Sequence, residues 1–115
     1  TFDYYTPVII SNNQFLENEP ETAKAFLAAL SKGYEEAAAN PEQAADILCQ
    51  VVPELDKALV LASQKYLSAQ YLADAKQWGY MDPVRWNGFY SWLNENSLLD
   101  PELPEDTGFT NDYLP

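Results

Sequence analysis

Residues 18–40, NEPETAKAFLAALSKGYEEAAAN, limit the fold more than any other part of the sequence because they read as one long helix. Apolar side chains recur there every three or four residues and so form a single stripe along a helix. They are Ala23, Phe26, Leu27, Leu30, Tyr34 and Ala37. Asn18 and Glu21 have the spacing of a capping box, and Pro20 suits a first turn whose N–H groups have no partner. We therefore predict an amphipathic helix that begins at about Asn18.

Two further helices are predicted directly after it. Asn40 and Pro41 repeat the start signal, and Pro53 ends this second helix at about Val52, because proline disfavours the α conformation at the residue before it. Its expected inner face is Ala44, Ile47, Leu48, Val51 and Val52. Asp56 is positioned to cap a third helix, with Leu59, Val60, Tyr66 and Leu67 at its apolar positions. The short connections predict that these three helices pack as neighbours.

A fourth helix is predicted to start at Asp82 and Pro83, after a loop that contains Gly79. Its inner stripe is expected to be Trp86, Phe89, Tyr90 and Leu93, while the direction of Trp92 stays open. Aromatic residues at helical spacing favour a core face, and a platform on which a ligand stacks is the alternative.

The first residues carry a strand signal. Residues 4–11, YYTPVIIS, are rich in aromatic and β-branched side chains, and Asn12 and Asn13 follow as a turn signal. Pro7 has no N–H for a ladder, so the strand lies at an edge or begins at Val8. Because the rest of the chain reads as helical, its partner strand would come from preceding polypeptide or from a second copy of the chain.

These elements together predict a mostly α fold with four main helices and one short N-terminal strand. At 115 residues, the chain has the length of one domain. We divide it into residues 1–17, a strand and crossover segment; residues 18–99, a helical region; and residues 100–115, an extended tail rich in acidic residues and proline. Apolar residues near the end of the tail indicate that it docks on the fold.

The charge and the reactive residue types exclude several functions. A net charge of −12 disfavours binding to nucleic acid and to anionic membranes. With no histidine and a single cysteine, Cys49, the usual zinc and copper ligand sets cannot be assembled, and we expect no metal and no cofactor. We also find no nucleophile paired with a base, no contrasting carboxylate pair and no phosphate-binding glycine loop. No catalytic residue is therefore predicted, and an enzyme is disfavoured.

The candidate ligand-binding residues are Asp3, Tyr4 and Tyr5. A polar aromatic pair at the start of a strand can stack on a flat ligand and also donate a hydrogen bond. The alternative is that one tyrosine packs in the fold while the other faces solvent.

The order of these signals resembles the C-terminal portion of NMT1/THI5-like solute-binding proteins. The resemblance covers nearly the whole chain and rests on YYTPVII at 4–10, NEPE at 18–21, AF at 25–26, KGY at 32–34, NPEQAA at 40–45, VPELD at 52–56, WG at 78–79 and FTNDYLP at 109–115. It is specific for the superfamily and less so for the substrate.

This resemblance implies a fragment of a two-lobed, type II periplasmic-binding-protein fold, in which two α/β lobes close over a small molecule and deliver it to an ABC permease. The implied location is extracytoplasmic, either periplasmic or lipid-anchored through an N-terminal segment that this sequence lacks. Relatives bind thiamine pyrimidine precursors, sulfonates, taurine or nitrate, and a pyrimidine precursor is the expected solute. Relatives that make the pyrimidine use a histidine as donor, and this chain contains none.

Two further expectations follow. If a lobe absent from this sequence normally covers the helix stripes, the chain leaves apolar surface exposed and self-associates. A free-standing acidic helical module that holds a protein partner is the alternative function.

Overall fold

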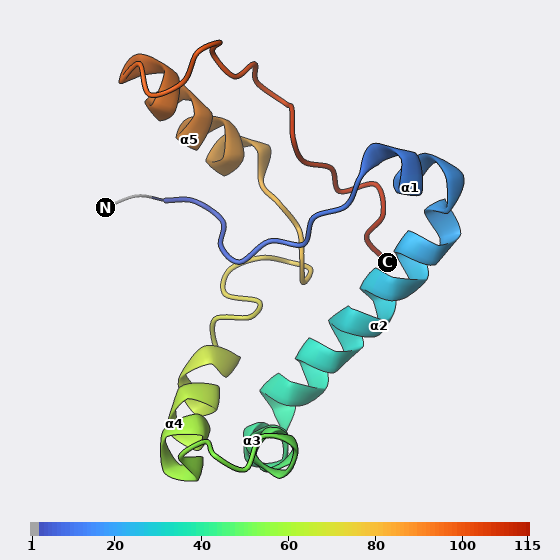
Figure 1. The fold of residues 1–115 in the computed structure, drawn as a ribbon, viewed down its shortest axis with the longest axis vertical. Helices are drawn as coiled ribbons and strands as arrows, with labels where there is room; N and C mark the ends of the chain where they lie inside the picture. Colours follow the sequence, from blue (N-terminus) through green and yellow to red (C-terminus); the bar gives the residue numbers. More distant parts are fainter. Residues whose placement is uncertain (1–2) are drawn as a thin grey trace.

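The computed structural model describes residues 3–115, and its regular structure in that range consists of five helices (Figure 1). They are α1 (Asn13–Asn18), α2 (Pro20–Ala39), α3 (Pro41–Val51), α4 (Lys57–Ser68) and α5 (Pro83–Glu95). The predicted mostly α fold is confirmed, and the four predicted helices correspond to α2–α5. Helix α1 was not predicted.

The strand predicted at residues 4–11 is not formed in the described chain. This segment runs alongside the rest of the fold without helix or strand, and no strand is assigned anywhere in residues 3–115. A strand needs a partner with which to pair its backbone groups, and the described chain places none beside this segment.

The turn signal after that segment starts α1 instead. The Asn12 side chain accepts a hydrogen bond from the Phe15 N–H at 2.7 Å and so caps this short helix. Because Asn18 is the last residue of α1, it cannot cap α2, and the predicted capping box with Glu21 is wrong. Glu19 holds the N-cap position, and Pro20 is the first residue of α2 as predicted.

The other helix starts agree with the sequence signals. Asn40 is at the N-cap of α3, although its side chain makes no capping bond. Asp56 caps α4 by accepting from the Leu59 N–H at 2.9 Å, and Asp82 caps α5 by accepting from the Val84 N–H at 2.9 Å. Asp82 therefore fixes the point at which α5 begins.

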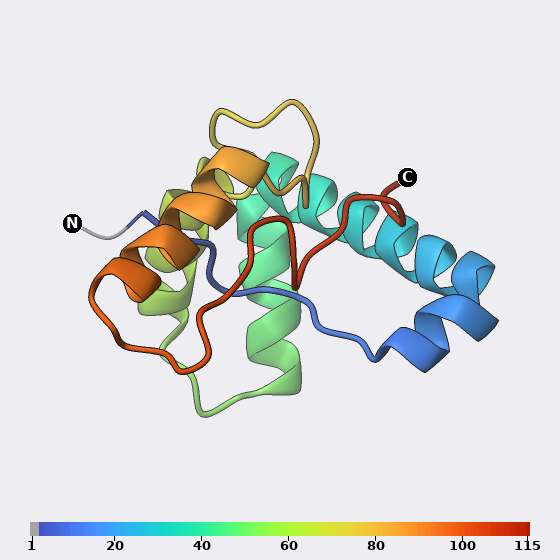
Figure 2. The same ribbon diagram turned by 90° about the horizontal axis from the view of Figure 1, so that it is seen from above.

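Helices α2, α3 and α4 form one packed unit, as predicted, whereas α5 packs against no other helix of the described chain. Ion pairs Lys57–Asp46 and Lys65–Glu42, both 2.8 Å, join α4 to α3. Figure 1 shows α5 apart from this unit, and Figure 2 shows the N-terminal segment and the C-terminal tail passing beside α5. Its position thus depends on those two segments. None of the helices within residues 3–115 is both long and apolar enough to cross a bilayer.

The tail is tied down by three asparagines whose amides each bond twice. Asn87 exchanges hydrogen bonds with Asp106 at 2.8 and 2.9 Å, and Asn94 does so with the Leu103 backbone at 2.8 and 3.0 Å. Asn111 binds both backbone groups of Met81 at 2.9 Å. The Phe109 ring packs on Trp86, with ring centroids 5.2 Å apart. The expectation that the end of the tail docks on the fold is confirmed.

The chain is open and has little core of its own. Among the described residues only Ala23, Ala45 and Ser31 are buried. The radius of gyration is 17.2 Å, against about 13 Å for a compact domain of this length. The exposed surface is 8687 Å², against about 6,300 Å² for a compact monomer of this mass.

Several residues expected on inner faces are exposed. Phe26, Ile47, Val51 and Leu59 are 57, 55, 76 and 69 % exposed. These residues lie on helices as predicted, but no other part of the described chain packs on their apolar sides. The large exposed surface results from this.

Candidate functional site

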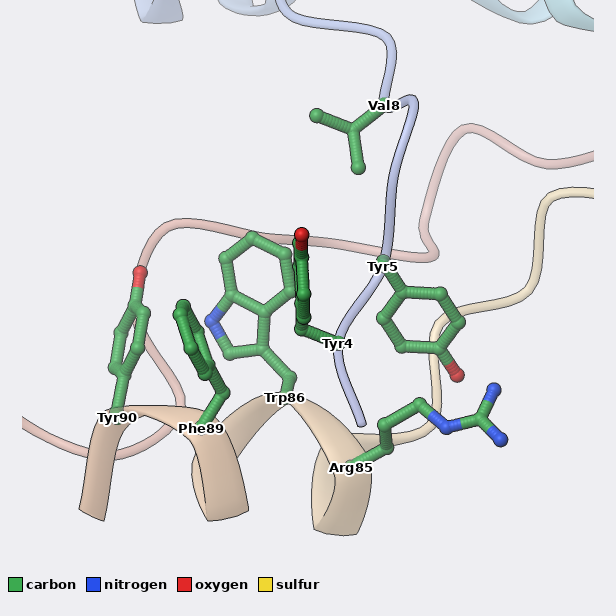
Figure 3. A pocket seen from close by; sticks show the side chains of 7 residues that line it. All are labelled: Tyr4, Tyr5, Val8, Arg85, Trp86, Phe89 and Tyr90. Carbon is green, nitrogen blue, oxygen red and sulfur yellow. The ribbon is translucent and has the colours of Figure 1, made fainter. Parts of the chain in front are cut away.

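A cavity of about 160 Å³ lies between the N-terminal segment and α5 (Figure 3). We call it the aromatic pocket and define it by its lining residues. They are Tyr4, Tyr5, Val8, Arg85, Trp86, Phe89 and Tyr90. Five of these seven side chains are aromatic, so the pocket offers mainly flat apolar surface.

One wall of the aromatic pocket comes from α5. Trp86, Phe89 and Tyr90 are three and four residues apart and therefore share one side of the helix. The Trp86 ring lies 5.5 Å from that of Tyr90, and Phe89 is parallel to Trp92 within 7°, with centroids 6.3 Å apart. The row continues into the tail through the contact between Trp86 and Phe109.

The opposite wall comes from the N-terminal segment. The Tyr4 ring stacks on Phe89, with centroids 5.2 Å apart and ring planes 21° apart. Figure 3 shows the rings of Tyr90, Phe89 and Tyr4 nearly edge-on, with the Trp86 indole drawn between those of Phe89 and Tyr4 and with Val8 above them. Tyr4 is 49 % exposed, so this wall is open to solvent.

Tyr5 is anchored at the start of α5. Its hydroxyl oxygen accepts a hydrogen bond from the Asp82 N–H at 2.8 Å, and the Arg85 guanidinium lies over its ring, 5.1 Å from the centroid. Arg85 Nε in turn pairs with Asp3 Oδ1 at 2.9 Å. Burial lowers the pKa of Arg85, but the Asp3 charge and Tyr5 outweigh this and raise the pKa overall. Arg85 therefore stays a cation that holds Asp3 and Tyr5 together.

Two of the three predicted ligand-binding residues line the aromatic pocket. Tyr4 and Tyr5 line the aromatic pocket, whereas Asp3 is not part of its lining and pairs with Arg85. Their role in ligand binding stays a prediction. Tyr5 is anchored and half-buried, whereas Tyr4 packs on Phe89 and also faces solvent.

The sequence analysis did not favour a pocket wall on α5. Trp86, Phe89 and Tyr90 were interpreted first as core, with a ligand-stacking platform as the alternative. All three are only partly buried, and together they form a pocket wall. The signal that could have identified them is the aromatic stripe itself, in a helix that has little other apolar surface.

A larger hollow, about 360 Å³, lies where α2 meets α3, but it is a weaker candidate. It is lined by Ala39, Asn40, Pro41, Glu42, Gln43 and Lys65, and no aromatic ring takes part. The charged groups in it, Glu42 and Lys65, are already paired with each other. No group of three or more His, Cys, Asp or Glu residues that could hold a metal ion is found within residues 3–115.

Comparison with known proteins confirms the resemblance drawn from the sequence. Residues 1–44 match the family model described as NMT1/THI5 like, and this range contains the N-terminal wall of the pocket. The chain is 26 % identical over 113 residues to the formylaminopyrimidine-binding protein of Halalkalibacterium halodurans, covering 95 % of this chain and 34 % of the relative. It is also 26 % identical over 118 residues to the riboflavin-binding protein RibY of Chloroflexus aurantiacus, covering 93 % of this chain and 32 % of the relative. The chain thus spans about a third of the length of these curated relatives.

Proposed function

We propose that this NMT1/THI5-like chain is part of an extracytoplasmic solute-binding protein, without enzymatic activity, that binds a small planar molecule and delivers it to an ABC importer. The favoured solute is a thiamine pyrimidine precursor. The observation that carries the proposal is the aromatic pocket, in which the matched N-terminal segment meets the aromatic side of α5.

The chemistry of the pocket favours a flat ring as ligand. Small-molecule sites combine mostly apolar and aromatic walls with a few polar groups that fix the orientation. Here Trp86 and Phe89 supply aromatic rings, and Tyr90 adds a hydroxyl group to the lining. A heteroaromatic ring with polar substituents fits both features.

The size of the pocket favours one ring over several. An engineered apolar cavity of about 150 Å³ binds benzene, whereas pockets for drug-sized ligands are about 300–1,000 Å³. At about 160 Å³ the aromatic pocket matches a single six-membered ring. Of the ligand classes named for the two relatives, this supports a pyrimidine rather than the three fused rings of riboflavin.

Thermal unfolding with each ligand tests the proposal. A ligand at a hundredfold excess over its dissociation constant adds about 2.7 kcal/mol to the free energy of unfolding. We expect formylaminopyrimidine to raise the melting temperature of the chain and riboflavin to leave it unchanged. Stabilisation by riboflavin alone, or by neither compound, would contradict the proposed solute.

Delivery to an ABC permease and the extracytoplasmic location are supported by the family resemblance. Cells that carry or lack the gene provide the test, through uptake of labelled formylaminopyrimidine. Equal uptake in both would argue against a transport role.

The acidic helical interaction module is the second candidate, favoured by the exposed apolar side chains of α3 and α4. Ile47, Leu48, Val51, Leu59 and Tyr66 are 46–76 % exposed. Exposed apolar surface on charged helices is a property of helix-in-groove partners. Absence of any ligand effect would favour this candidate over the first.

A further inference from the structure

We infer that the ring of a planar ligand takes the face of Phe89 on which Tyr4 stacks, and that Tyr4 turns away when the ligand binds. The inference rests on the proposed function. It adds that the Tyr4 ring and the ligand compete for the same face of Phe89. The Phe89 face beneath Tyr4 then becomes the ligand subsite.

The two adjacent tyrosines are held in different ways. Tyr5 is fixed by its hydrogen bond with the Asp82 N–H and by the guanidinium of Arg85. Tyr4 is held by its stack on Phe89, and its hydroxyl makes no hydrogen bond with the described part of the chain. Tyr4 can therefore leave its position while Tyr5 keeps the segment in place.

The backbone around Tyr4 offers little resistance to such a movement. Residues 3–11 form no helix and no strand, and among the described residues they make no backbone-to-backbone hydrogen bond. A change of the Tyr4 side-chain rotamer is enough, because the ring is already half exposed. The move thus breaks one ring contact and no hydrogen bond.

Phe89 has one face available for a ligand. Trp92 lies parallel to Phe89 with centroids 6.3 Å apart, and Tyr4 stacks on Phe89 with centroids 5.2 Å apart. Trp92 lies one turn along the same helix as Phe89, whereas Tyr4 belongs to a segment that forms no helix or strand. Tyr4 is the ring that can be replaced. Its departure also leaves more room in the cavity, which Tyr4 helps to line.

The stacked pair sets the size of the competition. In addition to the effect of surface burial, such an aromatic pair changes the equilibrium constant for forming the contact by a factor of about two to twelve. Removal of the Tyr4 ring should lower the dissociation constant of a planar ligand by up to this factor.

The test is calorimetric titration of formylaminopyrimidine into the chain and its Tyr4→Ala, Tyr4→Leu and Tyr5→Ala variants. We expect about two- to twelvefold tighter binding to both Tyr4 variants and weaker binding to Tyr5→Ala, which loses the anchor. Tyr66→Ala, at a 70 % exposed position on α4, is the matched control and should bind as the unchanged chain does. Weaker or unchanged binding to both Tyr4 variants would overturn the inference and make Tyr4 an ordinary pocket wall.

A second measurement separates this inference from the proposed function. Phenol has the same ring and hydroxyl group as the Tyr4 side chain. It should therefore bind the face of Phe89 that Tyr4→Ala leaves uncovered. We expect phenol to shift the NMR signals of the Phe89 ring in this variant, at concentrations that leave the unchanged chain unaffected. Equal shifts in both proteins, or none, would contradict the inference whether or not a pyrimidine binds.

Discussion

Tyr4 stacks on Phe89 with ring centroids 5.2 Å apart, although the two residues are 85 positions apart in the sequence. Because α5 packs against no other helix there, this contact and the neighbouring Tyr5–Asp82 hydrogen bond join α5 to the N-terminal segment. When Tyr4 turns away from Phe89, the Tyr5–Asp82 hydrogen bond and the Arg85–Asp3 ion pair keep the N-terminal segment beside α5.

The junction between the tail and the start of α5 should depend on Asn111. In Asn111→Ala the N–H and C=O of Met81 both lose their partner, and we expect the free energy of unfolding to fall by about 1–3 kcal/mol. Urea denaturation measures this change. Asn13→Ala, at an exposed position of α1, is the control. An unchanged urea midpoint for Asn111→Ala would show that water replaces both hydrogen bonds without loss.

The packing of α3 on α4 should depend on pH through Glu42. The hydrogen bond from Lys65 and the Lys65 charge lower the pKa of Glu42 below its ordinary value of 4.5. A lowered folded-state pKa stabilises the fold above the ordinary value, and this contribution is lost as the pH falls through the folded-state pKa. We expect the melting temperature of the unchanged chain to exceed that of Glu42→Gln at neutral pH.

This difference should shrink as the pH falls below 4.5, and also in 1 M salt, since both groups are exposed and salt screens such pairs. Each comparison is made between two proteins at one pH, so the titration of the other carboxylates cancels. A difference that is constant from pH 7 to well below 4.5 would exclude the ion pair as its source.

The exposed apolar surface should make the chain self-associate. Its exposed area exceeds that of a compact monomer by more than a standard interface of about 1,600 Å². We expect light scattering to give the mass of a dimer or larger species at high micromolar concentration. Added salt should favour association, because it screens the repulsion between chains of charge −12.

Val51→Lys places a charge at a 76 % exposed apolar position of α3 and should weaken the association. Gln50→Lys adds the same charge at a neighbouring polar position and should have less effect. A monomer of the unchanged chain at every concentration would refute this prediction.

The helices were predictable because their start signals are local. Asp56 and Asp82 each cap a helix a few residues away, and proline at the first helical position fixes a backbone angle by itself. Asn18 misled because Asn12, which carries the same signal, starts a shorter helix that ends at Asn18. Two equivalent caps close together cannot be ranked from propensity alone.

Features that depend on distant partners were not predictable. The strand at residues 4–11 was predicted from β-branched and aromatic side chains. These residue types do not show whether a partner strand lies beside the segment. Tyr4 and Tyr5 were predicted as ligand-binding residues from their ring and hydroxyl chemistry, and both line the aromatic pocket. Phe89 and Trp86 were taken for core because a helical stripe does not reveal which segment packs on it.

The most direct test of the account is a titration of the chain with formylaminopyrimidine, followed by tryptophan emission, because Trp86 lines the aromatic pocket and Trp92 lies beside Phe89. Phe89→Leu removes the stacking ring at similar volume, and Phe26→Leu makes the same change at a 57 % exposed position of α2. We predict saturable quenching in the unchanged chain and in Phe26→Leu, and weaker binding in Phe89→Leu, by less than about tenfold because the competing Tyr4 stack is lost together with the ligand stack. Equal affinity in all three proteins, or no saturation in any, would contradict a ligand site between the N-terminal segment and α5.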